Sequence, residues 1–154
     1  VADGQDIYDR KLKFFEARRR LTDCYDIYHR ELAALIDQSL ARFGCAVLID
    51  CHSMPSAGAL PFRENERPLD IVLGDRFGAS CSGAITAAAE TTLTGLGYQV
   101  SRNAPYAGGH VAAAYGRPLE GVHVLQIEIN RALYLDERRI ARTEGFERLK
   151  DHLK

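Results

Sequence analysis

The segment Asp50-Cys51-His52-Ser53 places an imidazole directly after an apolar run, beside a carboxylate, a thiol and a hydroxyl. The apolar run reads as a buried strand, so His52 would lie at the carboxyl edge of a sheet. An imidazole at that position can bind a metal ion or act as a base. It can equally be a structural histidine that bonds a loop carbonyl. Position alone leaves the two interpretations open.

A second set of polar residues follows alternate positions of a later apolar segment. Gln126, Glu128 and Asn130 would share one face of an extended chain, with apolar residues on the other face. Three polar side chains in a row are costly to bury unless they are paired or functional. Glu128 is therefore a candidate general base facing a site. The alternative is a half-exposed edge strand with one solvated face.

The loop Tyr106-Ala107-Gly108-Gly109-His110 presents a histidine on a flexible backbone. His110 is a candidate lid residue or substrate contact, or part of an exposed turn. Neither glycine pattern of nucleotide-binding loops occurs in the chain, so a nucleotide site is not expected. Cys81 opens a predicted helix but lacks a nucleophile turn, and it is not favoured as a nucleophile. Guanidinium groups suited to carboxylate recognition lie near the predicted loops at Arg63, Arg67, Arg76, Arg102, Arg117 and Arg131.

The apolar spacing predicts the elements that would position these residues. One long helix, or two abutting ones, is expected over residues 11–43, with further helices over 82–96 and 143–153. Short strands are expected over 45–50, 70–73, 98–101 and 122–129, and loops over 51–68 and 103–118. Alternating strands and helices indicate an α/β fold with a largely parallel sheet. Ligands bind such sheets outside the carboxyl ends of the strands.

Composition limits the class of protein. The 154 residues have a mass of 17.1 kDa, are 46% hydrophobic and 27% charged, and carry a net charge of -1. These values predict a single globular domain with no nucleic-acid or membrane partner. The apolar runs are too short to span a bilayer. Four cysteines occur without a C-x-x-C pair, so we expect reduced thiols in a cytoplasmic protein.

Four blocks of the sequence, taken together, resemble the N-formylglutamate amidohydrolase family. They are Ile49 to Ser53, Asp70 to Cys81, Asn103 to Gly116 and Gln126 to Glu128. The resemblance implies a three-layer α/β/α sandwich with a mostly parallel, mixed sheet, like that of zinc peptidases of the phosphorylase/hydrolase-like type. It also implies hydrolysis of N-formyl-L-glutamate to formate and L-glutamate, a late step of histidine breakdown.

The resemblance also assigns roles to individual residues. His52 is similar to a metal ligand of zinc carboxypeptidases, and Glu128 to their catalytic carboxylate. Asn103, His110 and Arg131 would bind the substrate. The implied cofactor is a divalent metal, most simply zinc. The metal would polarise the formyl oxygen, and Glu128 would pass a proton from water to the departing amine.

Two of the metal ligands that the resemblance implies have no counterpart in this sequence. They are expected in an upstream Pro-His-x-Gly motif and at an acidic residue beyond it, whereas the chain begins at Val1. The simplest interpretation is that residues 1–154 are the C-terminal portion of a larger, incomplete domain. The alternative is a non-catalytic, degenerate homologue, and a third reading is a metallopeptidase. A missing strand would leave a sheet edge open, so self-association is expected.

Overall fold

The computed structural model describes residues 6–59 and 67–154, and the chain divides into two compact units, Val1–Gln38 and Ser39–Lys154. The first unit is helical. Helix α1 (Phe14–Arg20) runs through a π-helical turn (Leu21–Tyr25) into α2 (Asp26–Phe43). The hydroxyl of Thr22 donates to the Arg18 carbonyl at 2.7 Å, a bond that competes with the regular helix pattern at this turn. The predicted helical segment is confirmed, with its start at Phe14.

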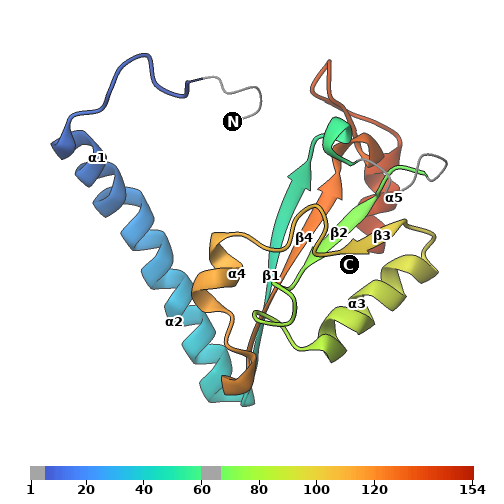
Figure 1. Cartoon of the computed structure of the whole chain (residues 1–154), viewed down its shortest axis with the longest axis horizontal. Coiled ribbons are helices and arrows are strands. Elements are labelled where there is room, and N and C mark those ends of the chain that lie inside the picture. The colour runs from blue at the N-terminus through green and yellow to red at the C-terminus, as the bar shows by residue number, and fades with distance from the viewer. Residues whose placement is uncertain (1–5, 60–66) are drawn as a thin grey trace. The chain divides into compact units, whose positions relative to one another are not determined.

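The second unit is built on a mixed four-stranded sheet in the order β1-β4-β2-β3 (Figure 1). Strand β1 pairs parallel to β4, and β2 pairs parallel to β3, whereas β2 and β4 are antiparallel. The mostly parallel, mixed sheet expected from the sequence is therefore confirmed. The strands are β1 (Ala46–Met54), β2 (Ile71–Gly74), β3 (Val100–Arg102) and β4 (Val122–Asn130).

Helices cover both faces of this sheet and give it three layers. Leu93 of α3 (Gly83–Gly95) and Leu149 of α5 (Gly145–His152) belong to one apolar cluster with Leu125 of β4. The opposite face of β4 carries Gln126, Glu128 and Asn130 and is contacted by α4 (His110–Tyr115). Ala112 of this helix is buried. The row of Gln126, Glu128 and Asn130 thus lies on the face covered by the short helix.

The structure corrects two of the predicted loops. Strand β1 continues to Met54 rather than ending at residue 50, because its pairing with β4 runs as far as Met54 opposite Asn130. The predicted loop 103–118 contains helix α4. Residues 60–66 of the other predicted loop, with Arg63, lie outside the described residues. A small hairpin of β5 (Leu135–Asp136) and β6 (Ala141–Arg142) and 3-10 turns at Ser56–Gly58, Pro118–Glu120 and Arg131–Leu133 complete the unit.

Ser82, the first residue of the predicted helix 82–96, is of a type that favours the N-cap position, and it is the N-cap of α3. Its hydroxyl accepts a hydrogen bond from the Ile85 backbone N–H at 3.5 Å, as an N-cap does. All four cysteines are unbridged, with Cys24, Cys45 and Cys51 exposed and Cys81 buried. The absence of a disulfide framework was predicted. No helix of the described residues is both long enough and apolar enough to cross a membrane.

Candidate functional site

The pairing of β1 with β4 brings the two predicted catalytic residues together. In this register Asp50 lies opposite Gln126, and His52 lies opposite Glu128. Residues two apart on a strand point to the same face, so all four side chains share the face that α4 contacts. Two separate sequence motifs, about 75 positions apart, therefore form one polar cluster on adjacent strands.

The His52 ring lies between two carboxylates. Its Nε2 is 3.2 Å from Asp50 Oδ2, and its Nδ1 is 3.5 Å from Glu128 Oε1. A protonated imidazole would form an ion pair with either carboxylate. Asp50 Oδ2 is buried and has no hydrogen-bond partner within residues 6–59 and 67–154. The His52 ring is therefore the neighbouring polar group that lies within 3.2 Å of this oxygen.

The carboxylate of Glu128 is buried and held on one side by an amide. The residue is 7% exposed, and Oε1 accepts a hydrogen bond of 3.0 Å from Gln126 Nε2. Burial raises the pKa of Glu128, and the charge of Asp50 adds to this effect. His52, the amide of Gln126 and the more distant charge of Arg131 oppose it. A carboxylate with a raised pKa is a stronger base once ionised, which suits proton transfer.

The glycine loop predicted to present His110 lies directly on the sheet. The side-chain oxygen of Gln126 accepts a 2.6 Å hydrogen bond from the Gly109 backbone N–H. A Cβ at Gly74, the last residue of β2, would lie 2.7 Å from the Gly108 nitrogen. Only glycine therefore allows this close approach. His110 follows as the first residue of α4, and it is exposed.

Asn103 holds a turn with its side chain. Its Oδ1 accepts from the Asp75 and Phe77 backbone N–H groups at 3.1 and 3.3 Å, and its Nδ2 donates to Asp75 Oδ1 at 2.7 Å. Burial alone would raise the pKa of Asp75, but hydrogen bonds from Asn103, Gly78 and Thr86 lower it overall. The substrate role expected of Asn103 remains a prediction, beside this observed structural role.

Arg131 follows β4 and is bonded back to β1. Its Nε donates to Ser53 Oγ at 3.2 Å, and a terminal guanidinium nitrogen donates to the Ser53 carbonyl at 3.3 Å. Its positive charge lowers the pKa of Glu128 to a small extent. Arg131 therefore lies at the same end of the sheet as Glu128, and its guanidinium carries N–H groups beyond the two that bond Ser53.

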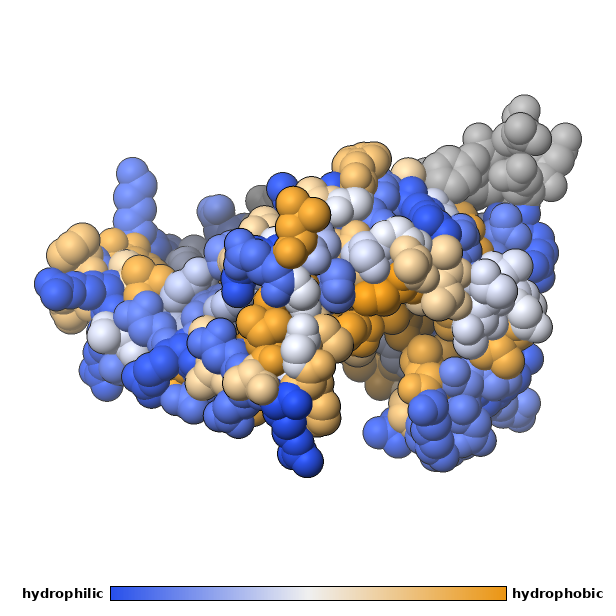
Figure 2. All heavy atoms as spheres, turned by 90° about the horizontal axis from the view of Figure 1, so that it is seen from below, coloured by the Kyte–Doolittle hydropathy of each residue, from blue (hydrophilic) through white to orange (hydrophobic). Residues whose placement is uncertain are grey.

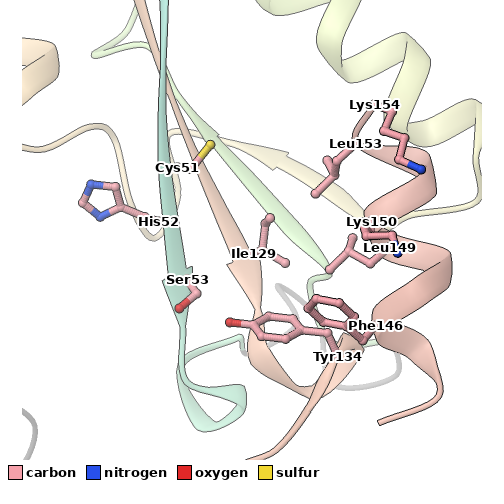
Figure 3. Close-up of a pocket in the computed structure, with 10 residues that line it drawn as sticks. All are labelled: Cys51, His52, Ser53, Ile129, Tyr134, Phe146, Leu149, Lys150, Leu153 and Lys154. Carbon is pink, nitrogen blue, oxygen red and sulfur yellow. The ribbon is translucent and has the colours of Figure 1, made fainter. Parts of the chain in front are cut away.

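A groove of about 610 Å³ lies on the other face of the sheet, beside α5. Cys51 of β1 and Ile129 of β4 point toward it, whereas the neighbouring His52 ring points to the opposite side of β1 (Figure 3). Figure 2 shows a hollow in the surface with apolar side chains on its walls. Because strand residues alternate, this groove is separated from Glu128 by the sheet itself. It is not the site of the carboxylate chemistry.

Two further expectations concern a nucleophile and a metal. Cys81, which the sequence does not favour as a nucleophile, is fully buried, and burial raises the pKa of its thiol. Among the described residues, no three His, Cys, Asp or Glu side chains are grouped so that they could hold a metal ion. Zinc sites have three or four protein ligands. The described residues alone therefore do not form a metal site, although His52 offers one imidazole.

Fold and site together define a three-layer α/β protein whose sheet carries a buried carboxylate beside an imidazole on the adjacent strand. A model of the N-formylglutamate amidohydrolase family matches residues 1–135, and the chain belongs to that family.

Individual relatives agree with this assignment. The chain is 34% identical over 138 residues to an N-formylglutamate deformylase of Pseudomonas aeruginosa, an alignment that covers 88% of this chain and 51% of that protein. It is 32% identical over 123 residues to an N-formylglutamate deformylase of Pseudomonas putida, covering 79% and 45%. The chain thus spans about half the length of these relatives.

Solved structures agree on the fold. The crystal structure of an N-formylglutamate amidohydrolase from Ralstonia eutropha superposes with a TM-score of 0.85 at 41% identity, covering 95% of this chain and 53% of that one. A gene product of Agrobacterium tumefaciens has a TM-score of 0.64 at 20% identity, over 97% of this chain and 56% of that chain. The second comparison supports the fold alone.

Sequence reasoning did not assign a catalytic or substrate-binding role to Gln126 or Asp50. Both lie two residues before a predicted site residue, Gln126 before Glu128 and Asp50 before His52. Because residues two apart on a strand point to the same face, this spacing could have placed each of them beside its site residue. For Asp50 the spacing applies only because β1 continues beyond residue 50 and includes His52.

Proposed function

We propose that this chain carries the catalytic carboxylate of an amidohydrolase that converts N-formyl-L-glutamate and water to formate and L-glutamate. The observation that carries the proposal is the buried Glu128 carboxylate, with its raised pKa, 3.5 Å from the His52 ring. The names of the bacterial relatives supply the substrate. The products would place the reaction late in histidine breakdown.

In this proposal Glu128 moves one proton. Its ionised carboxylate takes a proton from a water molecule as the water oxygen attacks the formyl carbon. The same carboxyl group then gives that proton to the amide nitrogen as the carbon–nitrogen bond breaks. Formate and the free amine of glutamate leave. His52 would keep Glu128 and Asp50 oriented, because its ring lies between their oxygens.

The substrate contacts are also proposed. Arg131 has guanidinium N–H groups beyond the two that bond Ser53, and such groups suit paired hydrogen bonds to a carboxylate. His110 opens α4 next to the loop that touches Gln126, and Asn103 lies in the turn bonded to Asp75. We propose Arg131 for a glutamyl carboxylate, and His110 and Asn103 as secondary contacts.

We further propose that His52 is one ligand of a divalent metal, most simply zinc, whose remaining ligands lie outside the described residues. Such an ion is a Lewis acid for a carbonyl oxygen. No step above depends on it. Elemental analysis of the protein that carries those remaining ligands, and of its His52→Ala variant, tests this part. The proposal expects bound metal that the substitution removes, and equal metal content in the two proteins contradicts it.

The reaction itself is tested by formate release from N-formyl-L-glutamate. We expect turnover by the wild-type chain and a loss on the order of 10²- to 10⁴-fold in Glu128→Gln. Glu120→Gln is the matched control, because Glu120 is exposed in the turn before β4. Turnover of a dipeptide in place of the formyl amide would favour a metallopeptidase. Absence of turnover by the folded wild-type chain would favour a non-catalytic homologue.

The free edge of β1 supports self-association of the 154-residue chain. No described strand pairs with the side of β1 that faces away from β4. Two apolar side chains of this edge strand, Val47 and Ile49, are 51% and 42% exposed. A long, apolar edge strand is a template for pairing with another strand. We propose a second copy of this chain as the partner.

A further inference from the structure

Gln126 uses both ends of its side-chain amide within the polar cluster. The residue is 3% exposed on the central strand β4. Its Nε2 donates to Glu128 Oε1 at 3.0 Å, and its Oε1 accepts from the Gly109 N–H at 2.6 Å. The reverse orientation of the amide would place two donors against each other at Gly109 and two acceptors at the ionised Glu128. The chemistry of the two neighbours therefore fixes the amide orientation.

The loop that Gln126 contacts is held against the sheet by its backbone. The Arg76 N–H donates to the Ala107 carbonyl at 2.7 Å. Gly108 has a φ of +117°, a conformation that favours glycine, and a Cβ at Gly109 would lie 3.1 Å from the Gln126 oxygen. The loop thus presents a bare N–H group to Gln126. Any shift of the loop changes the hydrogen bond at one end of the amide.

We infer that Gln126 is a positioning residue that couples the loop 107–110 to the carboxylate of Glu128. The inference rests on the proposed function for the catalytic role of Glu128, whereas the coupling itself rests on the two hydrogen bonds. A rigid amide with a partner at each end transmits a displacement of one partner to the other. When the loop is in place, the Glu128 carboxylate is oriented. When the loop moves, that carboxylate loses its amide donor.

Two substitutions at Gln126 distinguish the hydrogen bond to Glu128 from the hydrogen bond to Gly109. Gln126→Glu keeps an acceptor for the Gly109 N–H but removes the donor to Glu128 and places a second negative charge beside it. Gln126→Met has a similar size and removes both hydrogen bonds. Gln99→Met makes the same chemical change at a half-exposed glutamine just before β3 and serves as the control.

The coupling is measured without turnover, from the Gly109 amide proton in the two-dimensional ¹H–¹⁵N spectrum. We expect Glu128→Met to shift this resonance in the wild-type background, because Glu128 no longer anchors the amide of Gln126. In the Gln126→Met background, Glu128→Met should leave the Gly109 resonance unchanged. An unshifted resonance in the first comparison, or an equal shift in both, overturns the coupling.

The positioning role is measured by kinetics on N-formyl-L-glutamate. We expect Gln126→Glu to lower kcat by on the order of 10²-fold, with KM changed far less, because a misplaced base loses transition-state contact. Gln99→Met should match the wild type. A wild-type kcat in Gln126→Glu overturns the positioning role. If the wild-type chain itself shows no turnover, the proposed function fails, and the Gly109 spectrum still decides the coupling.

Discussion

His52 and Glu128 face each other across parallel strands, with His52 Nδ1 3.5 Å from Glu128 Oε1. Glu128 is buried, and Oδ2 of Asp50, on the other side of the His52 ring, has no hydrogen bond within the described ranges. A buried carboxylate without a compensating partner is costly. The His52 ring lowers the pKa of the Glu128 carboxyl and so opposes the effect of burial on it.

The pH dependence of stability should report the raised pKa of Glu128. Burial favours the protonated form in the folded chain, so the folded pKa lies above the ordinary value of about 4.3. Its contribution to stability is present below that value and is lost as pH rises through the folded pKa. Relative to Glu128→Gln, the wild type should therefore lose stability as pH rises across this window. Urea unfolding at several pH values checks this, and a difference that moves in the other direction contradicts it.

Removing the side chain of Asn103 should destabilise the fold. Asn103→Gly keeps a residue that adopts the observed φ of +57° but leaves the buried Asp75 without its amide donor. We expect a loss of about 1–3 kcal/mol in the free energy of unfolding. Asn103→Ala should lose more, because alanine adds backbone strain at this φ.

The lowered pKa of Asp75 should make the stability lost in the Asn103 variants depend on pH. Its pKa is lowered in the fold, so its contribution is present at neutral pH and is lost as pH falls through the folded pKa. Asn103→Gly should therefore cost more at neutral pH than in acid. Urea unfolding at both conditions measures the difference. Wild-type stability with only a higher KM would instead assign Asn103 to substrate contact alone.

A methyl group at Gly74 should displace the loop that precedes His110. The Cβ would lie 2.7 Å from the Gly108 nitrogen and 2.8 Å from the Ala107 carbonyl carbon, both backbone atoms. We expect Gly74→Ala to lower the free energy of unfolding by about 1–3 kcal/mol. Gly95→Ala is the control, because no atom lies within 4 Å of a Cβ there and alanine favours the helix. Equal stability of the two variants in chemical denaturation would contradict the close approach.

A charged residue in the edge strand β1 should reduce self-association. We expect the wild-type chain to sediment above the 17.1 kDa of a monomer in a concentration-dependent manner. Ile49→Lys should shift it toward monomer, because lysine on an edge strand opposes pairing with another strand. Sedimentation of the wild type as a monomer at all concentrations would exclude the proposed partner.

Much of the fold was predictable because its signals are local. The apolar run before His52, the alternation around Glu128 and the Ser82 cap each depend on neighbours in sequence, and each reappears in the structure. The continuation of β1 to Met54 was not predictable in the same way. Its polar residues read as loop until β4 supplies the strand to which they pair.

The sequence by itself determined the family, the α/β class and the two side chains, His52 and Glu128, best suited to the chemistry. Only the tertiary structure decided that these two meet, because strand register depends on pairing between distant segments. It also decided that the Gln126 amide forms hydrogen bonds with both Glu128 and Gly109, and that the Asn103 side chain forms a hydrogen bond with Asp75. Hydrogen bonds between side chains far apart in the chain depend on packing, which no local pattern of residues encodes.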